Sequence, residues 1–330
     1  MVNFIIWYKD SLSGFGSKKI ETHPIQYGDK ASEILIPILR PQHVGYHMAI
    51  DEKHIDGKYY TVLTNAMTGR VALLASTVVP HQIGNCIAKL GVSMENVAIL
   101  SRDLAPTFEN VGNLFFPHSM QVADKYHVVK HALDCLQDIR VRLKQQALNQ
   151  QKQQQTDYRK TKKKNKNKSG VLPTKKQARF VPDKIENGET FVELLTRSKY
   201  LLNIKNTKWN QYQIERSNLL FRYFPELKAA HEIIQRFRDW YEPIQKLESD
   251  FYLENQLLNW QFEAEQSKIK EVIHFQNLVK LNEEYILNYH KNLATNAIAE
   301  SVNAKIQKAI RDNNGTRDIE FFHFRLSKIL

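Results

Sequence analysis

Cysteine is scarce in this sequence, which has only Cys86 and Cys135 among 330 residues. Because no Cys-x-x-Cys pair occurs, a disulfide scaffold and a cysteine-based metal site are excluded, and the pattern is typical of a reducing compartment. Long apolar runs are also missing. None approaches the roughly 20 residues of a membrane span, and the apolar patch at residues 4–7 is too short for a signal peptide. These absences predict a cytoplasmic protein without a membrane partner.

Acidic residues are almost absent from residues 141–180, where Asp157 is the one acid against 13 Lys and Arg. This stretch carries the whole formal net charge of +12, because basic and acidic side chains balance in the rest of the chain. Its composition is of low complexity and nearly free of apolar groups, so we expect a disordered arm. Such a block binds polyanions through counterion release, and a solvated linker is the alternative. The expected DNA contacts in it are Lys162, Lys163, Lys164, Lys166 and Lys168.

Strand-like patterns are confined to the first part of the chain. Three runs rich in β-branched and aromatic residues predict an antiparallel meander, followed by a helix, a strand, a helix and a last short strand. The expected strands are 46–52, 59–66, 71–77, 96–101 and 120–123, and the expected helices are 79–90 and 106–116. This order predicts a mixed α/β fold with a five-stranded sheet.

Helical periods dominate from residue 126 onward. We therefore expect a large all-helical insertion between the strands and a last helix at about 293–310. The predicted divisions are an N-terminal segment of unclear fold at 1–45, core strands at 46–124, a helical insertion at 125–290 with its disordered basic arm at about 141–183, and a C-terminal helix at 291–330 that returns to the core.

Two acids lie where expected strands end: Asp51 ends the first strand, and Asp103 comes just after the fourth. If these strands are parallel neighbours, both carboxylates emerge at the sheet edge where α/β proteins place their sites. With a third carboxylate they can hold two divalent ions about 4 Å apart, which activate a water or a 3′-hydroxyl against a phosphodiester. Mg²⁺ is the natural ion, with Mn²⁺ as a substitute. For any single Asp, a turn or cap role is the alternative.

A family resemblance rests on several strings of the sequence. They are Ile50-Asp51-Glu52, Ser101-Arg102-Asp103, PHSMQVA followed by DKYHVVK at 124–130, and AIAESVNAKIQKAIRDNNGTRDIEFFHFR near the C-terminus. Together they resemble the bacterial insertion-sequence DDE transposases of the ISL3 group, from about residue 46 to the end. The resemblance implies a ribonuclease-H-like fold interrupted by a helical insertion. It also implies an enzyme that cuts DNA at element ends and joins the freed 3′-hydroxyl to target DNA.

The resemblance also implies roles for individual residues. Asp51 is the first catalytic and metal-binding acid, Asp103 the second and Glu300 the third, with Asp124 as the other candidate for the second. Asp124 and His127 form an Asp-x-x-His element near the site, and capping of the next helix is an equal alternative for His127. On its own helix Glu300 lies off the stripe formed by Ile298, Val302, Ile306 and Ile310, and a solvent-exposed Glu without a role in the site is the alternative. The basic side chains expected on DNA from this helix are Lys305, Lys308 and Arg311.

Members of this family usually carry an N-terminal zinc finger and a helix-turn-helix, and neither pattern is present here. The resemblance therefore implies a separate end-recognition polypeptide or a truncated remnant. We expect double-stranded DNA as the partner, a homo-oligomer on DNA, and association with the nucleoid when bound. The alternatives are an inactive remnant that only binds DNA and a ribonuclease-H-like nuclease without strand transfer.

Overall fold

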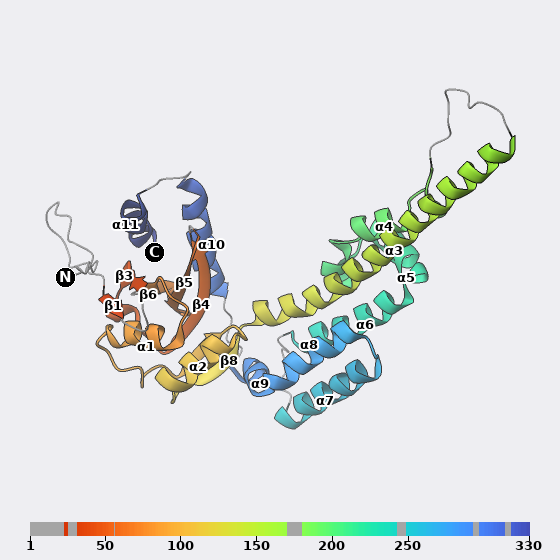
Figure 1. Ribbon diagram of the computed structural model, residues 1–330. Coiled ribbons are helices and arrows are strands. Elements are labelled where there is room, and N and C mark those ends of the chain that lie inside the picture. Colours follow the sequence, from red (N-terminus) through yellow and green to blue (C-terminus); the bar gives the residue numbers. More distant parts are fainter. Residues whose placement is uncertain are drawn as a thin grey trace. The chain divides into compact units, whose positions relative to one another are not determined.

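The computed structural model describes residues 23–25, 32–55, 57–169, 180–242, 249–292, 297–313 and 318–330. Within these ranges, the backbone alone is described for residues 23–25, 32–33, 165–169, 292, 297–300 and 303. The chain forms two compact units. Unit 1 combines Met1–Val128 with Asn282–Leu330, and unit 2 is the continuous segment Val129–Leu281. Figure 1 gives the elements of both units.

A mixed six-stranded sheet forms the centre of unit 1, in the order β3-β6-β5-β4-β7-β8. Its strands are β3 (Ile38–Leu39), β4 (His47–Ile55), β5 (Lys58–Asn65), β6 (Arg70–Ala75), β7 (Ile99–Arg102) and β8 (Met120–Ala123). The pairs β3–β6, β6–β5 and β5–β4 are antiparallel, whereas β4–β7 and β7–β8 are parallel. All five predicted strands are present. The sixth strand, β3, comes from the N-terminal segment whose fold the sequence left open, as does the separate antiparallel pair β1 (His23–Ile25) and β2 (Ser32–Ile34).

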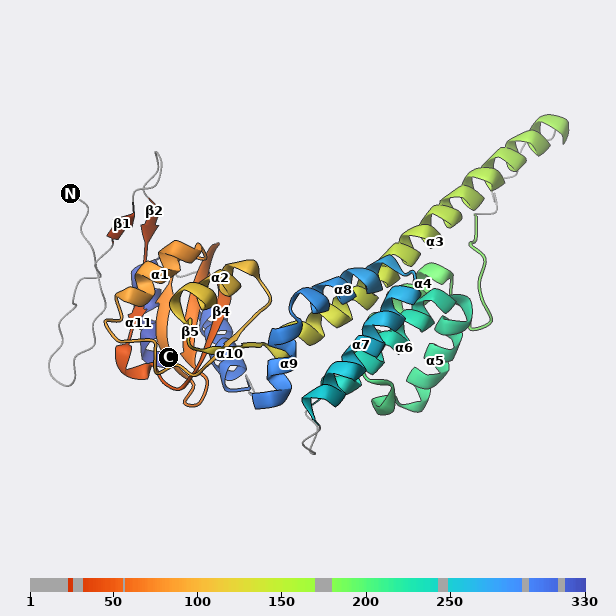
Figure 2. The ribbon, with the colours of Figure 1, turned by 90° about the horizontal axis from the view of Figure 1, so that it is seen from below.

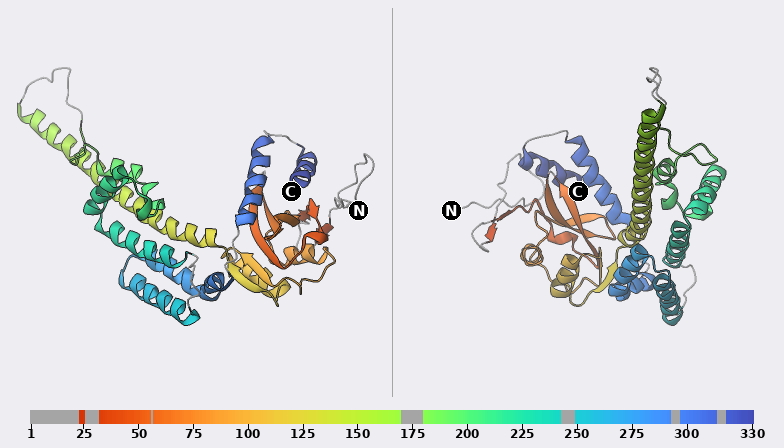
Figure 3. Two further views of the ribbon diagram at one scale, coloured as in Figure 1. Left: turned by 180° about the vertical axis from the view of Figure 1, so that it is seen from behind. Right: turned by 45° about the vertical axis from the view of Figure 1, so that its right-hand side comes forward.

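Helices cover both faces of the sheet because side chains alternate along each strand. On one face, Met48, Ile50 and Leu100 pack in a core with residues of α1 (Pro80–Ala88) and α2 (Pro106–Phe115). On the other face, residues such as Ile55 and Val62 pack with side chains of α10 (Ala297–Asp312) and α11 (Ile319–Ile329). Figures 2 and 3 show the two helical layers on opposite sides of the strands. The C-terminal helix therefore returns to the core, as predicted.

Unit 1 also contains α9 (Glu283–Asn292), which packs on the outer strand β8. Asn288 of α9 donates from Nδ2 to the backbone oxygen of Gln121 at 2.9 Å. The predicted insertion, which ran to residue 290, had included this helix. Its buried residues Ile286, Leu287 and Tyr289 follow a helical period like that of the preceding helices, so the sequence pattern placed it with them.

Unit 2 consists of helices and loops, without a strand among the residues described. It contains most of α3 (Lys125–Ser169), followed by α4 (Phe191–Arg197), α5 (Gln211–Tyr223), α6 (Pro225–Trp240), α7 (Asp250–Gln266) and α8 (Lys270–Leu281). Its centre is aromatic: Phe237, Trp260 and Phe275 lie with ring centroids 4.7–5.7 Å apart. Arg142 of α3 bonds Glu271 of α8 at 2.7 Å and Glu226 of α6 at 2.5 Å, so one side chain ties three helices together.

The prediction of a disordered basic arm at about 141–183 is wrong for residues 141–169, which belong to the single helix α3 that ends at Ser169. No proline or glycine interrupts residues 126–169, and Gln, Lys, Arg and Ala are strong helix formers. Low apolar content leaves this part of the helix without a buried face, but it does not prevent helix formation. The remainder of the predicted arm at 170–179 lies outside the described residues. None of the helices in the described ranges is long and apolar enough to cross a bilayer.

Candidate active site

The first predicted acid, Asp51, lies in the middle of β4 and not at its end as predicted, because β4 continues in antiparallel pairing with β5 as far as Ile55. It pairs across the sheet with Val62, and both point to the face that α10 and α11 cover. Its carboxylate is largely enclosed, with 15% of the side chain exposed. Oδ1 accepts a hydrogen bond from the backbone N–H of Glu52 at 2.7 Å. The alternation of β4, which buries Ile50 on the opposite face, thus fixes Asp51 at this position.

The second predicted acid, Asp103, directly follows β7. Ile50 of β4 is paired with Arg102 of β7 in the parallel register, so Asp51 and Asp103 each come one residue after a member of this pair. Asp103 is half-buried, and its Oδ1 accepts from the backbone N–H of Ala105 at 2.8 Å, which shapes the turn into α2. Burial raises the pKa of Glu52, and the negative charges of Asp103 and Asp51 raise it further. The structure thus concentrates carboxylates at the point where the parallel pairing of β4 with β7 ends.

The Asp-x-x-His element lies at the same sheet edge. Asp124 follows β8, and its backbone N–H donates to the backbone oxygen of Arg102 at 2.7 Å. In the first turn of α3, His127 Nε2 lies 3.7 Å from Asp51 Oδ1 and 3.8 Å from Asp124 Oδ2. His127 therefore stands between two of the acids. Asp124 also bonds the backbone N–H of Tyr126 at 2.9 Å, so it shapes the start of α3 as well.

A lysine that the sequence reasoning missed completes the surroundings of Asp51. Lys53 lies two residues further along β4, on the same face, and its Nζ is 2.7 Å from Asp51 Oδ2. Only 16% of its side chain is exposed, so the ion pair is largely shielded from water. The sequence signal that could have predicted this ion pair is the i, i+2 spacing of Asp51 and Lys53, because residues two apart in a strand lie on the same face.

A buried arginine supports the strand end that presents Asp103. Arg102 is fully buried, and Nε donates to Gln121 Oε1 at 2.6 Å, while Nη1 donates to the backbone oxygen of Asp103 at 3.0 Å. Its guanidinium also lies 4.2 Å from the ring centroid of Tyr285 on α9. Burial lowers the pKa of Arg102. The arginine joins β7, β8 and α9, and it fixes the backbone at Asp103.

The third predicted acid, Glu300, belongs to α10, and its side chain lies outside the described part of the chain. Two residues later, Val302 is buried against the sheet, as is Ile306, while Ile310 packs beside them. These three residues are the described members of the predicted apolar stripe. The helix that carries Glu300 thus lies on the same sheet face as Asp51.

The basic residues expected on DNA lie on two helices. Lys305, Lys308 and Arg311 are exposed on α10. On α3, Lys163 and Lys164 are exposed and Lys162 is half-buried, with its Nζ 5.7 Å from the ring centroid of Tyr158. Lys166 and Lys168 are part of the same helix, but their side chains lie outside the description. All these DNA contacts stay predictions.

No group of three or more His, Cys, Asp and Glu side chains within the described ranges forms a metal-binding cluster. Of the three predicted ligands, the side chains of Asp51 and Asp103 are described, whereas that of Glu300 is not. A hard divalent cation requires oxygen ligands of this kind. The chemistry of the two described carboxylates therefore fits such an ion.

Comparison with known families gives the identification. A family model described as a transposase, that of the ISL3 group of DDE transposases, matches residues 48–326. The match begins in β4, ends in α11 and includes unit 2. The chain therefore belongs to this transposase family, and transposases are DNA-processing enzymes. Searches of curated proteins and of solved structures gave no significant match.

Proposed function

We propose that this protein cuts DNA strands at the ends of an insertion sequence and joins the freed 3′-hydroxyl to target DNA, with Asp51, Asp103 and Glu300 as catalytic carboxylates. The observation that supports the proposal is the parallel register of β4 and β7, in which Ile50 and Arg102 are paired directly before Asp51 and Asp103. The helix of Glu300 lies on the same face. Family membership supports DNA as the substrate.

The topology supports a ribonuclease-H-like fold for unit 1. Three antiparallel strands, β6-β5-β4, are extended by two parallel strands, β7-β8, and helices cover both faces. The order of these strands and helices along the chain is the one that the sequence pattern predicted. The added β3 lies at the outer edge beside β6, far in strand order from the acids.

Asp51, Asp103 and Glu300 would hold the Mg²⁺ ions, with Mn²⁺ as a substitute. Two such ions, when bound, stabilise the attacking and leaving oxygens of an in-line displacement at phosphorus. The protein's own groups position the carboxylates: the backbone of Ala105 holds Asp103, and Lys53 neutralises Asp51. His127, which lies within 4 Å of two carboxylates, keeps Asp51 and Asp124 in a fixed relation.

Binding of DNA rests on the exposed cations. Lys305, Lys308 and Arg311 project from the helix that carries Glu300, so they would hold phosphates close to the carboxylates. The lysines of α3 would add contacts that depend on charge and not on sequence. A homo-oligomer on DNA, nucleoid association and a separate end-recognition polypeptide stay predictions of the resemblance.

The test uses DNA that bears the inverted repeats flanking the coding sequence. We expect Asp51→Asn, Asp103→Asn and Glu300→Gln each to abolish strand cleavage, with DNA affinity unchanged or higher because a negative charge near phosphates is removed. The control, Asp312→Asn, removes an exposed acid from the same helix α10 and should leave cleavage unchanged.

The outcomes separate the alternatives. A Glu300→Gln protein that cleaves at the wild-type rate would contradict the assignment of the third acid. Loss of activity in Asp124→Asn but not in Asp103→Asn would make Asp124 the second acid. Cleavage without any joined product would indicate a nuclease, and DNA binding without cleavage by the wild-type protein would indicate an inactive remnant.

A further inference from the structure

Helix α9 supplies a tyrosine to the strand end that carries Asp103. Tyr285, in the first turn of this helix, is half-buried, and the guanidinium carbon of Arg102 lies 4.2 Å from its ring centroid. The hydroxyl group of the same tyrosine donates to Oε1 of Glu109 in α2 at 3.2 Å. One side chain of α9 thus links the arginine that precedes Asp103 to a carboxylate of a second helix.

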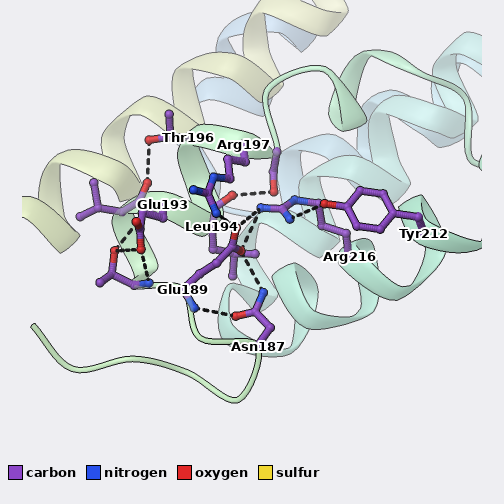
Figure 4. Close-up of polar contacts among 11 residues, drawn as sticks. Asn187, Glu189, Glu193, Leu194, Thr196, Arg197, Tyr212 and Arg216 are labelled. Carbon is purple, nitrogen blue, oxygen red and sulfur yellow. Dashed lines mark hydrogen bonds and ion pairs between the residues drawn. The ribbon is translucent and has the colours of Figure 1, made fainter.

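Arg102 is a buried cation without an ion pair among the described residues. Its hydrogen bonds go to neutral oxygens, one of a side-chain amide and one of a peptide group. Arg216 in unit 2 shows the more usual arrangement: with 9% of its side chain exposed, it donates from Nη2 to both oxygens of Glu189 at 3.0 Å (Figure 4). Since no carboxylate within the described ranges takes that place at Arg102, the electron-rich face of Tyr285 supplies compensation for its charge.

The balance of charge around this guanidinium depends on the tyrosine and on the acid behind it. Burial lowers the pKa of Arg102, and both Tyr285 and Glu109 act against this decrease. Burial and the charge of Glu109 raise the pKa of Tyr285, although Arg102 opposes them, so the phenol keeps its proton and remains a donor. A buried charge is costly when its surroundings do not compensate it. Removal of the ring is therefore expected to displace the guanidinium from its present position.

The position of the guanidinium is coupled to the backbone of Asp103. Nη1 of Arg102 donates to the backbone oxygen of Asp103 at 3.0 Å, and Nε donates to Gln121 Oε1 at 2.6 Å. Gln121 is itself fixed, because its Nε2 donates to Asn113 Oδ1 at 2.6 Å and a Cβ added to Gly112 would lie 2.5 Å from its Oε1. The amide has little freedom to follow a displaced guanidinium, so the displacement falls on the peptide group of Asp103, next to the carboxylate.

We propose that Tyr285 is a positioning residue for the metal site: by covering Arg102 it holds the peptide group of Asp103 and, with it, the carboxylate that would bind Mg²⁺. The inference rests on the proposed function, in which Asp103 is a metal ligand. It adds that α9, the first helix after unit 2 along the chain, contributes to metal binding without supplying a ligand. Groups that hold a metal ligand in place typically change metal affinity or activity by about 10- to 100-fold when they are replaced.

The experiment measures Mg²⁺ binding to the full chain by calorimetric titration, and DNA cleavage as a function of Mg²⁺ concentration. Tyr285→Leu removes the ring and the hydroxyl group, so the dissociation constant for Mg²⁺ should rise about tenfold. Cleavage should fall at limiting Mg²⁺ and recover at saturating Mg²⁺, with the KM for DNA unchanged. Tyr285→Phe keeps the ring over Arg102 and should retain most of the Mg²⁺ affinity.

Two control variants separate this role from a contribution to stability. Ile286 is fully buried on the same helix, so Ile286→Val removes a buried methylene group and lowers stability while the ring of Tyr285 stays in place. Tyr212→Leu also removes a tyrosine bonded to an arginine, but in unit 2, where its hydroxyl oxygen accepts from Arg216 Nη1 at 3.1 Å (Figure 4). Both variants should bind Mg²⁺ as the wild type does.

Three results would overturn the inference: wild-type Mg²⁺ affinity in a folded Tyr285→Leu protein, equal losses of affinity in Tyr285→Leu and Ile286→Val, and a loss of cleavage that saturating Mg²⁺ does not restore. If urea unfolding shows that Tyr285→Leu does not fold, Glu109→Gln tests the same link. It should weaken Mg²⁺ binding, and unchanged affinity in that variant overturns the inference. Asp103→Asn separates the two proposals. Mg²⁺ affinity that survives Asp103→Asn contradicts Asp103 as a metal ligand, whereas a loss in Asp103→Asn but not in Tyr285→Leu contradicts the role of Tyr285 alone.

Discussion

At the scale of single residues, Asp51 is the most constrained group of the candidate site. Its Oδ2 pairs with Lys53 and its Oδ1 faces His127, so both oxygens already have positively charged or chargeable neighbours. A divalent ion at Asp51 must compete with the lysine ammonium for the same carboxylate. The ion pair thus holds the carboxylate in place before the ion binds, at a cost in ion affinity.

Replacement of Lys53 by Met should therefore tighten the binding of Mg²⁺. An ion pair of this kind is worth up to about 1 kcal/mol, which corresponds to a roughly fivefold lower dissociation constant. Calorimetric titration of Mg²⁺ into the protein measures it. The control is Lys58→Met, which removes an exposed lysine from β5. Weaker Mg²⁺ binding in Lys53→Met would mean that the lysine positions Asp51 and does not compete for it.

The sequence was informative about Asp103 because the end of β7 can be recognised from its local apolar run, whereas Asp51 lies in the middle of β4, which continues past the apolar run into charged residues. The sequence did not predict the buried position of Arg102, whose partners Gln121 and Tyr285 come from β8 and α9. A charged residue inside an apolar strand is acceptable only when distant segments supply its bonds, and those cannot be inferred from local pattern. The roles of the three acids needed the family resemblance as well as the strand pattern.

At the scale of elements, the long helix α3 shows where two sequence signals disagree. Composition predicted a disordered arm, whereas helix propensity favoured a helix, and the structure follows propensity as far as Ser169. The two-residue strand β3 was missed for a simpler reason: a pairing so short leaves no alternation to detect. The five longer strands and the returning helix were predictable because each buries a regular apolar stripe.

Helix α6 holds a histidine whose titration should control the stability of unit 2. His231 is 2% exposed and stacks on Trp209, with ring centroids 5.3 Å apart. Burial, helped by the charge of Arg238, lowers the pKa of His231 to about 4. Its pKa in the unfolded chain is near 6.5, so between those values the unfolded state binds more protons and stability falls as the pH falls.

The decrease in stability attributable to His231 should reach about 3 kcal/mol between pH 6.5 and pH 4. Urea unfolding of the wild type and of His231→Phe at pH 7 and at pH 4.5 measures it, because the variant cannot gain the proton. The free energy of unfolding should drop less in the variant. His274→Phe, at an exposed position of α8, is the control and should follow the wild type. Parallel pH dependence in all three proteins would contradict the argument.

At the scale of the whole molecule, the positive charge is unevenly placed. The stretch 141–180 carries the whole formal net charge of +12, and residues 141–169 of it belong to α3. Helical order changes the physical role of this charge. Side chains on a helix are spaced at fixed intervals, so they can meet successive phosphates without the ordering cost that a disordered arm would have to meet on binding.

The last prediction tests whether this charge binds DNA. The variant replaces Lys160, Lys162, Lys163 and Lys164 by Gln, which keeps helix propensity while it removes four charges. Affinity for random duplex DNA should fall, and the slope of log affinity against log salt should decrease by roughly 0.9 for each phosphate that the protein no longer neutralises. The control replaces the exposed Lys228, Lys268, Lys270 and Lys280 of unit 2 by Gln, so that both variants have the same net charge. If the two variants show the same change in slope, only the overall charge matters and the helix has no special role. If the α3 variant keeps the wild-type slope, its lysines stay solvated in the complex, and binding to DNA must come from α10 and the remaining surface.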